Sequence, residues 1–312
     1  MKKKPRVITL EGKYDDRIYK DRVLRNMCLL GIDDAEQQAS QAALSNAVVG
    51  IAGAGGLGSH LALQLARLGI RHIKIADLDH YETTNMNRQL GADLENLGRN
   101  KALVVGEMVH KSLGDVTIEI FPEGIQRHTA DAFVAGCDLL FDLTDFYLID
   151  ERYALHRAFR ENSPAICMLC SCVWGWGATL YKFTKDGMTY EELLDIPEGT
   201  KIEDKHVERL ILMQANYLPR FPSLSTVYEW MRKVGNAPVL GATPPLGCGL
   251  LATRACLILC GLEREPYCKP LPPIPQYFLL DAAGLESGFY EFNGEWANPG
   301  IHERLFERRM SA

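Results

Sequence analysis

The chain alternates between short apolar runs and longer segments in which apolar residues recur every three or four positions. A short continuous apolar run predicts a buried strand, whereas the longer spacing predicts a helix with one buried face. Strands are expected at residues 47–53, 70–76, 116–121, 138–143, 165–172 and 178–183. Helices are expected between them at residues 59–68, 101–113, 129–135 and 147–162. This alternation predicts right-handed crossovers and a parallel sheet covered on both faces.

Three segments do not follow this alternation: a polar helical arm at 1–46, an excursion at 186–236 inside the main domain of 47–262, and a proline-rich tail at 263–312. The excursion contains charges, prolines and two predicted helices, at 204–217 and 223–234. Short strands are predicted in the tail at 277–280 and 289–292. The predicted fold is therefore α/β: a Rossmann-like, doubly wound, mostly parallel sheet with helices on both faces, an N-terminal helical arm and a C-terminal extension.

Composition narrows the classes of function. The 312 residues are 47% hydrophobic and 24% charged, which is typical of a soluble globular protein. A net charge of −6 gives no general attraction to nucleic acid or to an anionic membrane. No apolar stretch approaches the roughly 18 residues of a spanning helix, and the basic start is not followed by the apolar segment of a signal peptide. We therefore expect a soluble, cytoplasmic protein without a membrane partner, and the net charge disfavours a nucleic-acid partner.

A glycine-rich turn follows the first predicted strand of the main domain. Its glycines are Gly53, Gly55, Gly56 and Gly58, and a predicted helix begins directly after them. Such glycines allow a tight turn and a close approach of the backbone to phosphate. Asp77 ends the next strand, 19 residues after Gly58, where a carboxylate binds ribose hydroxyls. The pattern predicts a nucleotide site, and it permits either ATP or a nicotinamide dinucleotide.

The loop after Asp77 favours ATP. Arg88 and Lys101 place two cations near the phosphate cradle, which suits attack on a phosphate better than hydride transfer. Asp145 follows a strand that ends at the same edge of the sheet, and its carboxylate suits Mg²⁺ on the phosphates. Taken singly, the two cations also suit solvated surface pairs, and Asp145 also suits a cap of the following helix.

Five motifs together resemble the MoeB/ThiF/HesA family, relatives of the adenylation domain of ubiquitin-activating enzymes. They are GAGGLGS at the turn, Asp77 with Asp79, NMNRQ at 85–89, GRNKA at 98–102 and DLTD at 142–145. The sequence Arg22-Val-Leu-Arg25-Asn is also similar to the RYxRQ arm of that family, with Val23 in place of tyrosine.

The resemblance implies a role for each matching residue. Asp77 would bind the ribose of ATP, with Asp79 beside it in the nucleotide site. Lys101 would neutralise the phosphates and Asp145 would ligate Mg²⁺. Arg25 would reach the nucleotide of the other subunit of a homodimer. The residues that would line the phosphates are Asn85, Arg88 and Gln89.

The resemblance also implies the reaction. A carboxylate, at the C-terminus of a small ubiquitin-fold carrier protein or of a precursor peptide, would attack the α-phosphate of ATP and form an acyl-adenylate. Positioning and charge neutralisation would do most of this work. Three kinds of acceptor remain open: a sulfur donor, an amine, or a group within the substrate itself.

The cysteines depart from the family pattern. Many members hold zinc with paired CxxC motifs, but residues 185–192, where the first pair belongs, contain no cysteine. Cys167 and Cys170 would point to opposite faces of a strand, and Cys256 and Cys260 sit among apolar residues of a predicted helix. We therefore predict no zinc.

No cysteine lies between Cys172 and Cys248, so the excursion cannot form the covalent thioester of some relatives. Cys248 is expected near the start of a helix, where a buried thiol is the default and a reactive one the alternative. We therefore predict an ATP-dependent adenylyltransferase that works without a thioester in this loop. The alternatives are a non-catalytic, nucleotide-binding dimer partner and an NAD-dependent oxidoreductase.

Overall fold

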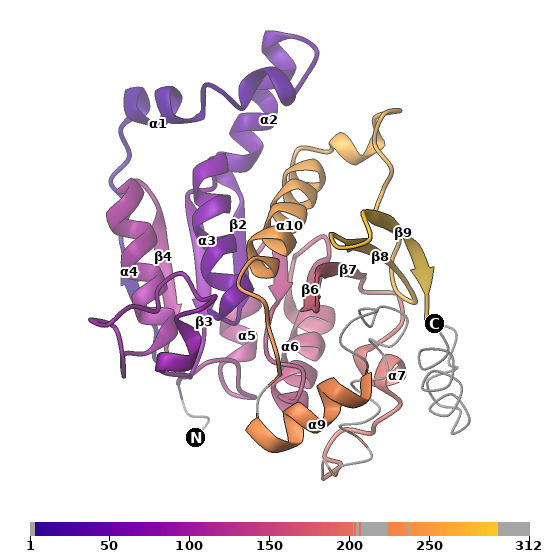
Figure 1. Ribbon diagram of the computed structural model, residues 1–312. Coiled ribbons are helices and arrows are strands. Elements are labelled where there is room, and N and C mark those ends of the chain that lie inside the picture. Colours follow the sequence, from indigo (N-terminus) through magenta and orange to yellow (C-terminus); the bar gives the residue numbers. More distant parts are fainter. Residues whose placement is uncertain (1–3, 202, 204–205, 207–223, 236, 293–312) are drawn as a thin grey trace.

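The computed structural model of this chain describes residues 4–201, 203, 206, 224–235 and 237–292. Nine strands of this part form one sheet, in the order β1-β4-β3-β2-β5-β6-β7-β8-β9 (Figure 1). The strands are β1 Ile8–Leu10, β2 Val48–Ala52, β3 His72–Ala76, β4 Thr117–Phe121, β5 Leu139–Asp142, β6 Met168–Trp174, β7 Gly177–Phe183, β8 Gln276–Asp281 and β9 Glu286–Glu291. The α-helices are α1 Asp16–Val23, α2 Asp34–Asn46, α3 Gly56–Leu68, α4 Lys101–Leu113, α5 Ala130–Val134, α6 Ile149–Asn162, α7 Tyr190–Leu194, α9 Leu224–Val234 and α10 Thr243–Leu259.

The centre of the sheet is parallel, as predicted. Strands β4, β3, β2, β5 and β6 pair in parallel, whereas β1 joins β4, and β7 to β9 continue from β6, in antiparallel pairings. The antiparallel strands β1, β8 and β9 come from the two terminal segments, so the sheet extends beyond residues 47–262. Antiparallel neighbours need no crossover helix, so helical spacing in the sequence does not reveal such pairings.

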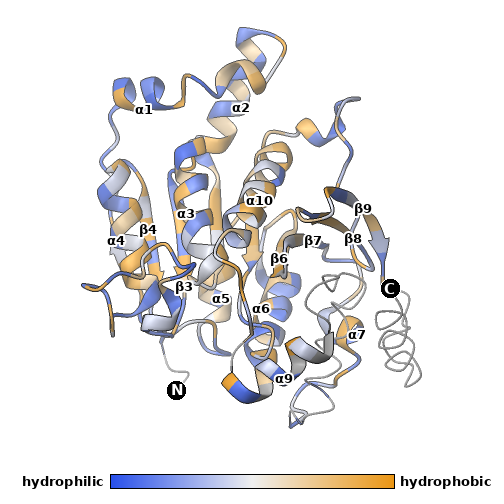
Figure 2. Cartoon of the chain, in the orientation of Figure 1, coloured by the Kyte–Doolittle hydropathy of each residue, from blue (hydrophilic) through white to orange (hydrophobic). Residues whose placement is uncertain are grey.

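Helices cover both faces of the sheet, which confirms the doubly wound arrangement. Helices α2, α3, α4 and α10 contribute to one apolar core, and α5, α6, α7 and α9 to the other. Adjacent residues of one strand serve opposite cores: in β5, Phe141 belongs to the first and Leu140 to the second. Strands β2 and β5 are apolar apart from Gly50 and the terminal Asp142, as strands buried on both faces require, whereas β3 carries Lys74 and β4 carries Glu119. The helices that cover the sheet carry both hydrophobic and hydrophilic residues (Figure 2).

Residues at the ends of helices α3 and α4 set the bounds of these two helices. Asn100 caps α4 by accepting a hydrogen bond from the Leu103 amide, and Gly114 ends that helix with a φ of +72°. Helix α3 ends at Gly69, whose φ of +118° is the left-handed conformation that glycine adopts without strain. Helix α4 therefore has its predicted bounds, whereas α3 ends at Leu68 as predicted but begins at Gly56, three residues before the predicted start.

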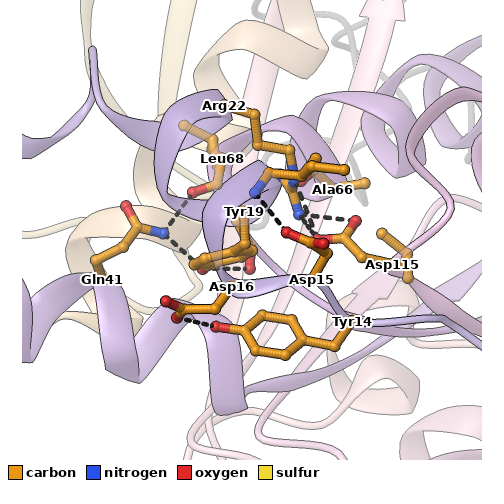
Figure 3. Close-up of polar contacts among 12 residues, drawn as sticks. Tyr14, Asp15, Asp16, Tyr19, Arg22, Gln41, Ala66, Leu68 and Asp115 are labelled. Atoms are coloured by element: carbon orange, nitrogen blue, oxygen red, sulfur yellow. Dashed lines mark hydrogen bonds and ion pairs between the residues drawn. The ribbon is translucent and has the colours of Figure 1, made fainter.

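The N-terminal arm is anchored to the far end of α3 (Figure 3). The Tyr19 hydroxyl donates to the Gly69 carbonyl over 2.9 Å. The Arg22 guanidinium donates from Nη2 to Asp115 Oδ2 over 2.9 Å and from Nη1 to the Ala66 carbonyl over 2.8 Å. The arm thus lies at the edge of the sheet opposite the glycine-rich turn.

The predicted helix at 204–217 lies outside the described residues, as does the tail beyond 292. The second helix of the excursion is present as α9. Among the helices that the structure describes, none is both long enough and apolar enough to span a membrane.

Candidate functional site

The glycine-rich turn between β2 and α3 leaves one face open to a ligand. Gly53 has a φ of +97°, and a Cβ on it would lie 2.4 Å from the Leu143 carbonyl oxygen. A Cβ on Gly58 would lie 1.8 Å from the Gly53 oxygen, so the fold itself requires both glycines. A Cβ on Gly55 would meet only Gln89 Nε2, at 3.8 Å, within the described chain. The absence of a side chain at Gly55 therefore leaves room for a ligand.

Helix α3 begins at Gly56 in this turn, and no side chain caps its first amides. Unpaired amides at a helix N-terminus, together with the helix dipole, favour an anion. The turn therefore combines open space with an electropositive helix end, the two properties that a phosphate site needs.

Asp77 lies at the end of β3, beside the turn. Its carboxylate accepts hydrogen bonds from the Ala54 amide, at 2.7 Å, and from the Asp79 amide, at 2.8 Å. Burial raises the pKa of Asp77 to about 6, although the Lys101 ammonium opposes this shift. Lys101 is itself buried and pairs with Asp79 Oδ2 over 3.1 Å. Asp79 therefore positions Lys101, a role that the spacing of the two aspartates does not reveal.

The segment after Asp77 brings Asn85, Arg88 and Gln89 to the same place. Asn85 is buried and accepts a hydrogen bond from the Glu82 amide, which shapes the short helix η2 Thr83–Asn85. Arg88 is held by the Thr84 carbonyl and by Asn87 Oδ1, at 2.9 Å and 2.8 Å. Burial lowers the pKa of Arg88, and Asp145 opposes this shift. Gln89 is buried, and its Oε1 has no hydrogen-bond partner among the described residues.

The two aspartates at the end of β5 and in the loop after it have different surroundings. Asp142 is fully buried and is bound by Arg152 Nε at 2.7 Å, His156 Nε2 at 2.9 Å and the Thr144 hydroxyl at 2.6 Å. Asp145 is exposed, and its Oδ2 accepts a hydrogen bond from the Tyr147 hydroxyl over 3.0 Å. Asp145 is therefore the carboxylate of this pair that can reach a ligand.

The cluster around Asp142 was not anticipated from the sequence. Burial alone would raise the pKa of Asp142, but the Arg152 guanidinium and the hydrogen bonds from His156 and Thr144 together outweigh it and hold the pKa far below its usual range. Burial lowers the pKa of His156, so this imidazole is neutral near pH 7. The available signal was that Arg152 and His156 stand four residues apart on a helix, and therefore on one face of it.

A single cavity of about 1390 Å³ brings these groups together. Among the predicted site residues, all except Gly58 and Arg25 line it. Gly58 serves the turn itself, as its close approach to Gly53 shows. The cavity continues past Arg152 to β6, β7, α7 and α9, where Tyr181, Tyr190 and Trp230 form part of the wall. Sequence reasoning assigned no role to these aromatic residues.

Arg25 lies apart from the other predicted site residues. It is exposed, and the neighbouring Asn26 donates to the Leu68 carbonyl at the C-terminal end of α3. The turn lies at the other end of this 13-residue helix. At 1.5 Å per residue the two ends are about 20 Å apart, beyond the reach of an arginine side chain. Arg25 therefore does not serve the cavity of its own chain.

The positions of the cysteines agree with the expectation that Cys167 and Cys170 point to opposite faces of a strand. Cys167 packs in one core and Cys170 in the other, on opposite faces of the sheet, so their sulfur atoms cannot share a metal ion. Cys248 is fully buried, and its thiol donates to the Leu57 carbonyl over 2.9 Å. Burial raises the pKa of Cys248, which disfavours the reactive thiolate.

The residues present fit ATP with Mg²⁺. The open face of Gly55 and the uncapped start of α3 border the space where a nucleotide would lie, and Gln89, whose buried Oε1 has no partner among the described residues, also lines this space. No set of three or more histidine, cysteine, aspartate or glutamate side chains in the described chain could hold a metal alone. Mg²⁺ would therefore bind Asp145 together with phosphate oxygens and water, the ligand set it prefers.

Comparison with known proteins places the site in a family. Residues 25–292 match the ThiF family. A relative in Candida albicans, the adenylyltransferase and sulfurtransferase UBA4, is 32% identical over 158 residues, which are 51% of this chain and 34% of that protein. The chain therefore spans about a third of the length of that relative.

Solved structures show the same fold at lower identity. PaaA superposes with a TM-score of 0.66 at 20% identity, covering 90% of this chain and 86% of its own. E. coli MccB with ATP superposes with a TM-score of 0.62 at 19% identity, covering 88% of this chain and 72% of its own.

Proposed function

Because the chain belongs to the ThiF family, we propose that it is a Mg·ATP-dependent adenylyltransferase that activates a carboxylate as an acyl-adenylate. The observation that carries this proposal is the shared cavity. It joins the open glycine turn to Asp77, Arg88, Lys101 and Asp145 and continues into further space. Ligand sites typically measure about 300–1,000 Å³, so about 1390 Å³ leaves room for a second substrate beside the nucleotide.

In the proposed reaction, an oxygen of the substrate carboxylate attacks the α-phosphorus of ATP and pyrophosphate leaves. The bond between the α-phosphorus and the bridging oxygen breaks, and its electron pair goes to pyrophosphate. Asp77 would hold the ribose hydroxyls, while the amides of the turn and of α3 would hold phosphate oxygens. Bound Mg²⁺ would neutralise phosphate charge. These groups fix the geometry of an in-line attack, and no general base is needed because the nucleophile is already a carboxylate.

Arg88 and Lys101 would stabilise the charge that develops during the reaction. Lys101 is buried, and Arg88 is half-buried, so the surrounding protein screens their charges less than bulk water does. The pairing of Lys101 with Asp79 holds the ammonium beside Asp77 before any nucleotide binds. Both cations are thus in place in advance, which minimises the reorganisation needed during the reaction.

Arg25 would act in a homodimer, on the nucleotide of the partner. Its distance from the cavity of its own chain supports this role. Exposed apolar side chains flank it on the arm, and a second exposed apolar group lies on the chain segment around Arg88. The two groups are Leu24, Leu29 and Ile32 on the arm, and Met86, Leu90 and Leu94 on that segment. In a two-fold symmetric dimer the arm of each chain would cover the second group of the other, and both would be buried.

The activated carboxylate would lie at the C-terminus of a ubiquitin-fold carrier protein or of a peptide. The acyl-adenylate would then pass to an external acceptor or to a group within the substrate. The absence of cysteine between 173 and 247, together with the buried thiol of Cys248, supports a transfer without an enzyme thioester in the excursion. We also propose that no zinc is bound, because Cys167 and Cys170 face apart.

The decisive experiment is ATP–pyrophosphate exchange with added carboxylates. We expect Arg88→Ala and Asp145→Ala to lower the exchange rate by about 100- to 1,000-fold, the usual effect of removing one charge-stabilising group. Arg99→Ala and Asp150→Ala are matched controls, because both residues are exposed and lie outside the cavity lining. Their exchange rates should stay within about twofold of the wild type.

Other outcomes would favour the alternatives. ATP binding without exchange over a broad panel of carboxylates would indicate a non-catalytic dimer partner. Binding of NADH in preference to ATP would indicate an oxidoreductase. Either result would refute the proposed adenylyltransferase activity.

A further inference from the structure

The cavity has a charged half and an uncharged half. Its charged lining residues all belong to segments 77–101 and 145–152, around the nucleotide turn. The lining residues contributed by β6, β7, α7 and α9 include none with a charge, within the described chain. A cavity divided in this way provides two chemically different compartments for two parts of one reaction.

The uncharged half is walled largely by aromatic side chains. We call it the aromatic chamber and define it by Tyr181, Phe183, Tyr190, Leu193, Trp230 and Phe292. The rings support one another: Tyr181 stacks on Phe292 at 5.8 Å between centroids, and Phe183 meets Tyr190 edge-on at 5.9 Å. This mutual packing orders the rings before a ligand binds, so binding does not have to provide the free energy of ordering them.

Among the described residues, one cation reaches the chamber, and it is already neutralised. The Arg152 guanidinium lies over the Tyr190 ring, 4.4 Å from its centroid, and its Nε pairs with Asp142. Its Nη2 also donates to Cys170 Sγ over 3.3 Å. A second carboxylate in the chamber would therefore find no unpaired charge, whereas an apolar or aromatic group would find flat apolar walls.

From these observations we infer that the activated carboxylate belongs to an acid with a large apolar or aromatic group beside the carboxyl, and that this group occupies the aromatic chamber. This inference rests on the proposed adenylation. A terminal glycine has no side chain to place against these rings, so the chamber favours a larger acid over it. The same chemistry is found in a free aryl-alkanoic acid and in a peptide that ends in phenylalanine or leucine.

The test is ATP–pyrophosphate exchange by the full-length chain with two series of acids. One series is N-acetyl-glycyl dipeptides ending in Gly, Ala, Leu or Phe, and the other is free propionate and 3-phenylpropionate. Burial of a large apolar side chain predicts a kcat/KM roughly 10- to 100-fold higher for the Phe or Leu acid than for its small counterpart. The series that shows this ratio identifies the source of the group.

A pair of tryptophan variants tests the position of the chamber. Trp230 and Trp176 are similarly exposed, at 42% and 38%, but only Trp230 lines the cavity. We expect Trp230→Ala to lower the preference for Phe over Gly by at least about threefold, through loss of apolar contact, and Trp176→Ala to leave it unchanged. As a readout independent of turnover, 3-phenylpropionate should raise the melting temperature of wild-type protein with a non-hydrolysable ATP analogue, and propionate should not.

The outcomes separate this inference from the proposed function. Equal or faster exchange with the glycine-terminated acid would overturn the inference and leave the adenylation intact. An equal loss of preference in both tryptophan variants would also overturn it. Binding of ATP without exchange for any acid in either series would overturn the inference, and the same result over the broad panel of carboxylates, carrier-protein C-termini included, would overturn the proposed function as well.

Discussion

Arg152 provides a sharp test of the reasoning about the site, because it neutralises a carboxylate that water cannot reach. Asp142 is fully buried, the Arg152 side chain is 8% exposed, and the two charges approach to 2.7 Å. At an effective dielectric constant of 20, this distance corresponds to an attraction of about 6 kcal/mol. In Arg152→Met the apolar side chain would fill much of the same space but leave Asp142 without a cation.

We expect this substitution to lower the free energy of unfolding at pH 7 by about 3 kcal/mol. Breaking a buried pair by removing one partner typically costs about 3–5 kcal/mol. The lower end applies because Thr144 and His156 still donate hydrogen bonds to Asp142, and because Arg152 borders the cavity, from which water can enter. Urea denaturation followed by far-UV circular dichroism measures the change.

The pH dependence of the stability provides an independent test of the same pairing. In the wild type, the lowered pKa of Asp142 contributes stability that is present above about pH 4 and is lost as the pH falls toward the pKa of the folded state. In Arg152→Met, burial would still raise the pKa of Asp142, and the guanidinium that lowers this pKa most in the wild type would be absent. Protonation would then relieve the unpaired charge, so the difference between variant and wild type should shrink between about pH 7 and pH 5.

Two further variants complete the test. Asp142→Asn combined with Arg152→Met removes both charges and should cost less than Arg152→Met alone. Arg127→Met breaks a pair in which the arginine side chain is 70% exposed, and it should change stability by less than about 1 kcal/mol. A cost below about 1 kcal/mol for Arg152→Met, or a cost that does not vary with pH, would refute the reasoning.

Two other predictions concern nucleotide binding and the dimer. Because burial raises the pKa of Asp77 to about 6 and ribose hydroxyls bind its ionised form, adenosine affinity measured by calorimetry should fall up to about tenfold per pH unit below that value. In Asp77→Asn this dependence should vanish; if it persists, another group is titrating. If Arg25 acts on the partner, mixing inactive Arg25→Ala and Asp145→Ala chains should restore about a quarter of wild-type exchange activity, since half the dimers regain one intact site. No recovery after demonstrated subunit exchange would contradict action across the interface.

Much of the fold could be predicted because local signals agreed with one another. The helix expected at 101–113 is present with those bounds, since Asn100 caps its start and Gly114 ends it. The glycine-rich turn joins β2 to α3 as predicted, because no side chain fits at Gly53 or Gly58. β1 was not predicted as a strand: it has three residues, and its pairing partner lies more than 100 residues away along the chain. Such a short strand carries too little periodicity to be recognised locally.

The sequence by itself determined the parallel core, the nucleotide-type turn and the family, because glycine conformation, helix capping and apolar spacing act over a few neighbouring residues. Only the tertiary structure revealed that Asp142 is buried and paired with Arg152 while Asp145 is exposed, and that aromatic residues from four separate segments wall one chamber. It also placed Arg25 at the far end of α3, away from its own site. These properties depend on burial and on contacts between distant segments, which exist only once the chain has folded.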